Sequence, residues 1–132
     1  MAMAVPRMAA AAPTPLEGLR AVFMKHARFV ARHPGVPRLI LNELQKPRDT
    51  PVKRRARSMQ ENYRKLVARL LAEAEKRGEI VAGLDRDGAA TLFIGAVQGL
   101  MLQAMLAGST SKLEAEAKRV FSIYLNAVRK PS

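Results

Sequence analysis

The segment between Gly88 and Gly108 restricts the possible folds of this chain more than any other, because it contains no charged residue. Charged residues make up 26% of the whole sequence, so a neutral run of this length stands apart from the rest. A helix that is apolar on every side must also be covered on every side. Three arrangements meet that requirement: a membrane, the core of one subunit, or a seam between two copies of the chain.

A membrane span fits the length of the segment, since about 20 apolar residues cross a bilayer. Gly95 and Gly99 also have the spacing of a helix-association motif. However, Thr91, Gln98, Gln103 and five alanines lower the hydrophobicity of the segment. The other expected helices are amphipathic and would find no apolar partner surface inside a bilayer. We therefore expect no membrane association.

The two remaining arrangements differ in what covers the outer face of this helix. Four other helices in a chain of 132 residues offer little surface for covering it completely. Gly95 and Gly99 would let another backbone approach closely. In the last helix, Ile123, Leu125 and Ala127 are apolar although they lie off its main stripe. This surplus of apolar surface favours a homodimer, and a monomer with a central helix is the alternative.

Apolar residues recur at helical spacing along the rest of the chain, and no stretch alternates as a half-exposed strand does. The sequence therefore predicts an all-α domain of about five helices. Thr14 and Thr50 each precede a proline, which is a typical helix start. The expected helices run from Pro15 to near Arg32, from Pro37 to about Gln45, from Pro51 to about Arg77, along 88–108, and from Ser111 onwards. An apolar stripe from Val52 through Met59 to Ala74 lines the third of them.

The first residues, MAMAVPRMAAAAPTP, contain one arginine and no bulky apolar core before the prolines, so they do not resemble a secretory signal. We expect residues 1–14 to form a flexible arm and residues 15–130 to form the single domain. The chain has no cysteine, which excludes a disulfide framework and suits a reducing cytoplasm.

Positive charge is concentrated in the first half of the chain. Residues 1–69 carry 15 Lys or Arg and 4 Asp or Glu, a net charge of +11, out of +12 for the whole protein. Such a half suits a polyanionic partner, and it equally suits a merely solubilising surface. Lys53, Arg54, Arg55 and Arg57 form a basic cluster that can hold DNA weakly and without sequence preference. Tyr63 is the only aromatic residue beside this cluster, so base stacking is poorly provided for.

The sequence contains no recognisable catalytic constellation. It has no glycine-rich phosphate loop, no nucleophile elbow and no clustered acid pair. Its two histidines, His26 and His33, lack partner carboxylates at metal-ligand spacing. We therefore expect no enzyme activity, no metal and no cofactor. His26 lies near the apolar side of the first helix, either as a half-buried core residue or as a polar group in a pocket.

Three stretches of the chain together resemble a known domain: RAVFMKHARFVARHPGVPRLILNEL, YRKLVARLLAEAEKRGEI and LDRDGAATLFIGAVQGLMLQAML. Their telling features are His33-Pro34 before the helix with Arg38, Leu41 and Glu43, then Glu73-Ala74 before Gly78-Glu79-Ile80, and Asp85 followed by Thr91, Gly95, Gly99 and Leu100. In these features the chain resembles the C-terminal regulatory domain of the tetracycline-repressor (TetR) family, over roughly residues 15 to 130.

The resemblance implies an all-α effector-binding and dimerisation domain whose last two helices pair with those of a second copy as a four-helix bundle. It also implies a pocket for a hydrophobic small molecule, which changes the spacing of two DNA-binding heads. In that family a helix-turn-helix head precedes the domain. Only residues 1–14 precede the first expected helix here, so operator recognition is carried over to no residue of this chain. The alternative function is a basic helical protein that binds nucleic acid without sequence preference.

Two sets of residues follow from these expectations. The expected ligand-binding residues are the inward-facing Phe23, His26, Phe29, Tyr63, Leu66, Leu70, Phe93, Val97 and Met101. The expected dimer interface consists of Gly95, Gly99, Gln103, Phe121, Tyr124, Leu125 and Val128. For each pocket residue, ordinary core packing is the competing explanation.

Overall fold

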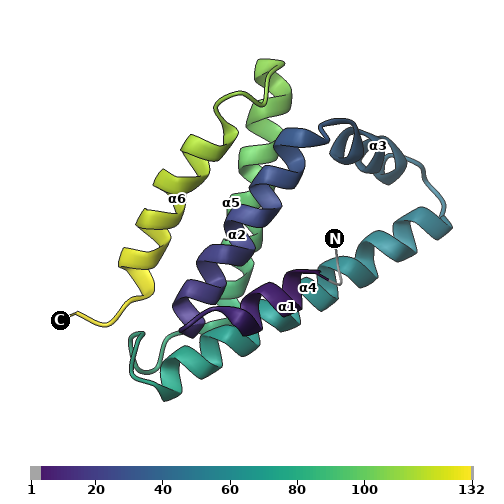
Figure 1. Cartoon of the computed structure of the whole chain (residues 1–132). Helices are drawn as coiled ribbons and strands as arrows, with labels where there is room; N and C mark the ends of the chain where they lie inside the picture. Colours follow the sequence, from purple (N-terminus) through teal and green to yellow (C-terminus); the bar gives the residue numbers. More distant parts are fainter. Residues whose placement is uncertain (1–3, 132) are drawn as a thin grey trace.

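The computed structural model describes residues 4–131 and consists of helices packed into a bundle (Figure 1). The helices of this part are α1 (Ala4–Ala11), α2 (Pro15–Arg32), α3 (Gly35–Leu44), α4 (Pro51–Lys76), α5 (Arg86–Ala107) and α6 (Leu113–Val128). The described residues contain no strand beyond one antiparallel bridge between Ile80 and Arg129. The all-α class expected from the sequence is confirmed.

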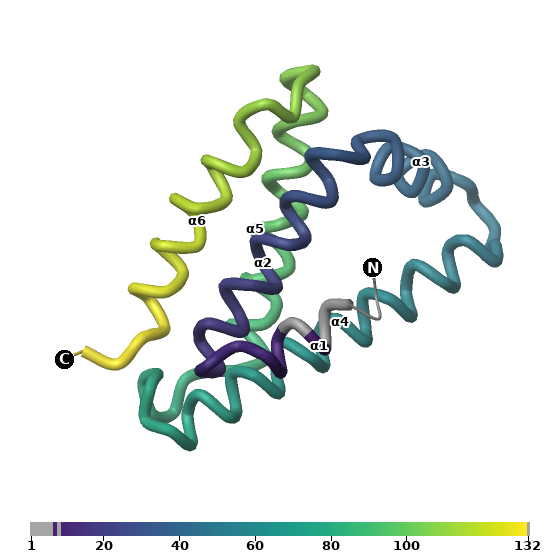
Figure 2. Tube along the Cα trace, in the orientation of Figure 1, coloured from purple at the N-terminus to yellow at the C-terminus, as the bar shows by residue number. Residues whose placement is uncertain are grey.

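Helix α2 lies at the centre of the arrangement and contacts α1, α4, α5 and α6. Helices α5 and α6 run alongside it, and α4 passes its lower end diagonally (Figure 1). Helix α3 joins the other end of α2 to the start of α4, far from the C-terminus of the chain (Figure 2). It packs mainly on α4. The bundle therefore has a compact body and a projecting corner made of α3 and the first half of α4.

Local capping sets where the longer helices begin. The hydroxyl oxygens of Thr14 and Thr50 accept hydrogen bonds from the backbone N–H groups three residues on, at 3.1 and 3.2 Å. Asp85 does the same for the N–H of Gly88 at 2.9 Å. Such caps satisfy donors that have no partner inside the helix. The Asp85 cap starts α5 at Arg86, two residues before the expected start.

The N-terminal segment contains a helix where a flexible arm was expected. Helix α1 packs against α2, and the side chain of Ala9 is buried there. A Cβ atom at Gly18 would lie 3.2 Å from the carbonyl oxygen of Ala9, so the absence of a side chain at Gly18 permits this close approach. Alanine is the best helix former and is small enough for such a contact, which explains the difference.

The core is centred on three fully buried phenylalanines, Phe23, Phe93 and Phe121. The ring of Phe23 lies 5.2 Å from that of Phe93 and 5.3 Å from that of Phe121. Helix α4 contributes buried residues only from Leu66 onwards. Val52 and Met59, which belong to its expected apolar stripe, are exposed instead. The first half of α4 therefore lies beyond the core that its second half helps to build.

Candidate functional site

The expected pocket walls Phe23 and Phe93 contact each other directly. Their rings meet edge to face with an interplanar angle of 82°, and both are completely buried. Edge-to-face packing at this distance leaves no space between the rings. These two residues are therefore core residues in this structure, as the competing explanation had it.

His26 of α2 and Tyr63 of α4 form a half-buried polar pair next to this aromatic core. Their ring centroids are 5.2 Å apart, and the rings are inclined at 70°. Burial lowers the pKa of His26 and raises the pKa of Tyr63, because both ionised forms lose hydration there. The imidazole and the phenol are thus held in their neutral forms. Half-burial of His26 is compatible with both interpretations, a half-buried core residue and a polar group in a pocket.

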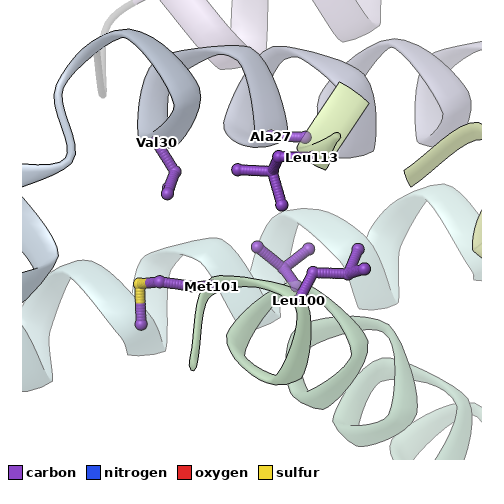
Figure 3. Close-up of a pocket in the computed structure, with 6 residues that line it drawn as sticks. Ala27, Val30, Leu100, Met101 and Leu113 are labelled. Carbon is purple, nitrogen blue, oxygen red and sulfur yellow. The ribbon is translucent and has the colours of Figure 1, made fainter. Parts of the chain in front are cut away.

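An apolar depression lies one helical turn further along α2. It is lined by Ala27, Val30, Val97, Leu100, Met101 and Leu113. In Figure 3, Ala27 and Val30 of α2 face Leu100 and Met101 of α5, and Leu113 comes from the start of α6. The depression is too small to admit a water molecule. Val97 and Met101, which were both expected in the pocket, thus line a depression that is closed in this structure.

The remaining expected pocket residues lie elsewhere. Phe29, near the end of α2, is half-buried with its ring 4.9 Å from that of His33. Leu66 and Leu70 line a separate groove of about 270 Å³ between α1 and the second half of α4. The structure therefore brings together Phe23, His26, Tyr63, Phe93, Val97 and Met101 but places Leu66 and Leu70 on a different cavity.

Three residues of the expected dimer interface are buried within the chain itself. Phe121, Tyr124 and Val128 belong to the core, and the Tyr124 hydroxyl donates a hydrogen bond of 2.8 Å to the carbonyl oxygen of Ala89. Their apolar side chains pack inside the chain and leave almost no exposed surface. Leu125, also expected at the interface, is half-buried.

The other expected interface residues lie on the outer face of α5. Gly95 and Gln103 are exposed, and Gly99 is half-exposed. A Cβ atom at Gly95 or Gly99 would meet nothing within 4 Å. Sequence reasoning missed the leucines around them, although their steps of four and three residues were visible in the sequence. The α5 stripe comprises Leu92, Gly95, Gly99, Leu102 and Leu106, and its leucines are 57%, 50% and 80% exposed.

Helix α5 thus has two apolar faces with different surroundings. By length and composition alone it qualifies as a membrane span, and 39% of its most apolar window is buried in the fold. Its inner face packs on α2, α4 and α6. On α6, Ile123 is 71% exposed and adds a further apolar side chain to the surface. Exposed apolar side chains therefore lie on the outer faces of both α5 and α6.

The basic cluster on α4 is partly neutralised by its own neighbours. The guanidinium groups of Arg54 and Arg57 lie 3.5 and 2.6 Å from the carboxylate of Asp49. The hydrogen bond from Arg57 is the main reason why the pKa of Asp49 is lowered. The Lys53 ammonium group donates to the carbonyl oxygen of Lys46. These contacts favour a solvated basic surface over a dedicated nucleic-acid interface.

Within residues 4–131 no group of three His, Cys, Asp or Glu side chains is placed so that it could hold a metal ion.

Residues 15–120 match the family model described as "Tetracyclin repressor-like, C-terminal domain". Among curated proteins none matches the chain.

Solved structures with the same fold include the ketosteroid transcriptional regulator KstR2 of Mycobacterium tuberculosis. Its TM-score is 0.82 at 17% identity, and the match covers 98% of this chain and 66% of that one. A protein studied for the control of antibiotic production by bacterial hormones has a TM-score of 0.75 at 18% identity, covering 98% and 73%. A transcriptional regulator from Chloroflexus aurantiacus J-10-FL has a TM-score of 0.73 at 23% identity, covering 96% and 66%. The present chain thus spans about two thirds of the length of these proteins.

Proposed function

The chain belongs to the family of tetracycline-repressor-like C-terminal domains, and from this premise we propose that it is a dimeric domain that senses a hydrophobic small molecule. The family match covers α2 to α5 and the first half of α6. The single observation that supports sensing is the apolar region between α2, α4 and α5, which contains one half-buried polar pair, His26 and Tyr63. An adaptable apolar wall with few polar groups is the usual composition of a ligand site.

The α5 stripe supports the dimer. Three leucines exposed on one helix face form a contiguous apolar surface of the kind that soluble monomers seldom leave open. The two glycines between them let a second α5 approach closely. In the proposed dimer, α5 and α6 of both copies form a four-helix bundle, with Ile123 at its edge.

The site is closed in this structure, so binding requires side chains to move apart. Met101 is suited to such movement, because an unbranched thioether side chain adopts many shapes at little cost. One structural relative is a ketosteroid regulator, and a rigid apolar effector of that kind would suit the aromatic walls here. The effector class that we propose is hydrophobic, with little charge.

The proposed role in regulation follows from the position of α2. This helix contacts the effector region with Phe23 and His26 and carries α1 on its N-terminal half. Separation of α2 from α5 would therefore shift the N-terminal segment. The family resemblance implies a DNA-binding head before this domain, and we propose a cytoplasmic regulator in which such a head contacts DNA. This chain itself would touch DNA only weakly, through the basic cluster.

A thermal-shift screen of hydrophobic and amphipathic compounds tests the sensing role. A ligand at 100 times its dissociation constant stabilises the folded state by about 2.7 kcal/mol, which is a clear shift of the melting temperature. Ala27→Phe places a bulky side chain where a ligand would have to open the apolar depression, and it should remove the shift of a true ligand. Ala115→Phe, at an exposed position on α6, is the matched control. If no compound shifts the melting temperature, the sensing role is wrong.

A further inference from the structure

Two buried polar atoms face the effector region without a hydrogen-bond partner. Nδ1 of His26 and the hydroxyl oxygen of Tyr63 are two of the three such atoms in the described part of the chain. Their rings are adjacent, at 5.2 Å between centroids. A buried polar atom that has given up water and gained no partner costs free energy. A ligand that forms hydrogen bonds with both neighbouring atoms would recover this free energy.

Two polar side chains of α4 on either side of Tyr63, those of Gln60 and Arg64, already have hydrogen-bond partners on α5. The amide of Gln98 donates to Gln60 at 3.3 Å. The guanidinium of Arg64 donates to the hydroxyl of Thr91 at 2.8 Å. Both hydrogen bonds join α4 to α5 at exposed positions and flank Tyr63 along α4. They hold the two helices together and leave the polar pair to be satisfied by another molecule.

The polar pair stands at one edge of an apolar surface. The ring of Tyr63 lies 6.1 Å from that of Phe93. On α2, Phe23, Ala27 and Val30 share a face with His26 through their helical spacing. Ala27 and Val30 line the apolar depression with Met101. A ligand that opens this depression would place its hydrocarbon against these residues and any polar group beside His26 and Tyr63.

Building on the proposed sensing function, we propose that His26 and Tyr63 recognise a neutral oxygen function, a hydroxyl or a carbonyl, on an otherwise apolar effector. The Tyr63 hydroxyl donates to such an oxygen. Nδ1 of a neutral imidazole accepts or donates according to its tautomer. A ligand hydroxyl can pair with either tautomer, because it both donates and accepts hydrogen bonds. A ligand carbonyl oxygen accepts from both Tyr63 and His26 when Nδ1 carries the proton.

The same geometry argues against a carboxylate. Among the described residues no charged side chain is fully buried, and the guanidinium of Arg64, the neighbour of Tyr63 in sequence, donates its hydrogen bond to the hydroxyl of Thr91. An anion placed there would lose its hydration and gain only neutral partners. A plain hydrocarbon would leave both buried atoms without a partner, and a site built to bind an oxygen discriminates strongly against the analogue that lacks it.

A series of bicyclic probes tests this inference on the full chain. 1-Naphthol and 1-tetralone carry a neutral oxygen, naphthalene carries none, and 1-naphthoate carries a charge. Calorimetry should show tighter binding of naphthol or tetralone than of the other two, by a factor of ten or more. Tyr63→Phe and His26→Phe should each reduce this preference about tenfold without weakening the binding of naphthalene.

Tyr124→Phe is the matched control, because it removes a phenolic hydroxyl that already has the carbonyl of Ala89 as partner. It should lower the melting temperature of the free protein and leave the preference among the probes unchanged. Tyr63→Phe should keep or raise the melting temperature, since it removes an unpaired buried group. A loss of stability as large as that of Tyr124→Phe would show that the Tyr63 hydroxyl has a structural partner, such as an internal water, and would overturn the proposal.

The remaining outcomes separate this inference from the sensing role. Tightest binding of naphthoate, or equal binding of naphthalene and naphthol, overturns the inference and leaves sensing intact. If none of the four probes binds, the hits of the thermal-shift screen replace them, and hits without a neutral oxygen also overturn it. If that screen has no hits, the sensing role itself is wrong and the inference falls with it.

Discussion

Tyr63 and Tyr124 bury the same chemical group in opposite circumstances. The hydroxyl of Tyr124 joins α6 to α5 through the carbonyl of Ala89, whereas the hydroxyl of Tyr63 has no partner in the described structure. Both tyrosines were named from the sequence as functional residues. Periodicity places an apolar or aromatic residue on an inner face, but it does not reveal whether the polar atom at its tip finds a partner. That depends on the carbonyl groups that the neighbouring helix presents.

His26 should make the stability of the fold depend on pH. Burial lowers its pKa, whereas the unfolded chain has an ordinary histidine pKa of about 6.5. The unfolded state therefore takes up a proton first as the pH falls. The contribution of His26 is complete above pH about 6.5 and is lost toward lower pH, at no more than about 1.4 kcal/mol per pH unit. Urea unfolding at pH 7 and pH 5 measures it.

The matched variants for this measurement are His26→Phe and His33→Gln. His33 is the other histidine and is exposed at the end of α2. His26→Phe should flatten the dependence between pH 7 and pH 5, and His33→Gln should not. Equal slopes for the native chain and for His26→Phe would show that His26 is not the titrating group.

At the scale of helices, the starts are the most predictable feature, because a cap involves only three or four neighbouring residues. Thr14 and Thr50 were identified as caps from the sequence, and the structure shows both hydrogen bonds. The burial of a helix face is less predictable. Val52 and Met59 continue the periodic stripe of α4, yet they are exposed, because the first half of α4 lies beyond the core and packs mainly against the short helix α3. Periodicity identifies a face, but only the tertiary arrangement decides what covers it.

Helix α1 should depend on the close approach at Gly18. In Gly18→Val the added Cβ would lie 3.2 Å from the carbonyl oxygen of Ala9, and the two further methyl groups of valine would push α1 away from α2. We expect α1 to detach and Arg7 within it to become a faster site of tryptic cleavage, by about tenfold. Limited proteolysis followed by mass spectrometry measures this rate. Gly35→Val is the control, since a Cβ atom there meets nothing within 4 Å.

The α5 stripe should hold two copies of the chain together. Leu102→Asp places a charge in the middle of the stripe and should convert a dimer into a monomer at about 10 μM, because an unpaired buried charge costs several kcal/mol. Sedimentation velocity measures the change. Ser58→Asp, exposed on the projecting half of α4, is the control that should remain dimeric. A native chain that sediments as a monomer at this concentration would contradict the proposed interface.

At the scale of the whole molecule, the question is whether the positive net charge gives the chain a DNA-binding function. The 132-residue chain should bind the promoter of its own gene no better than a scrambled duplex, since no described residues form a helix-turn-helix. Any binding should fall steeply between about 50 and 200 mM salt. Fluorescence anisotropy with both duplexes measures this. A preference of tenfold, about 1.4 kcal/mol, that persists at the higher salt would make the nucleic-acid function the leading one.

Fold class and domain type were predictable for the whole molecule, because helical periodicity and the family resemblance extend over most of the chain. The candidate site was predictable only in part. Phe23 and Phe93 were named as ligand-binding residues and Phe121 as an interface residue, and all three are fully buried together in the core of this structure. An inward apolar face is the same in a sequence whether it meets a ligand, a partner or its own core.

One helix, α5, carries Phe93, Val97 and Met101 on one face and Leu92, Gly95 and Leu102 on the other. In the proposed dimer, the effector and the partner subunit would therefore contact opposite faces of the same helix, α5. Thermodynamic linkage then makes the two equilibria reciprocal: if pairing tightens effector binding by some factor, saturation with effector tightens pairing in the same sense and by a matching amount. The apparent affinity for the effector would therefore depend on the concentration of the protein. A dilute sample would be half-saturated at a different effector concentration from a concentrated sample.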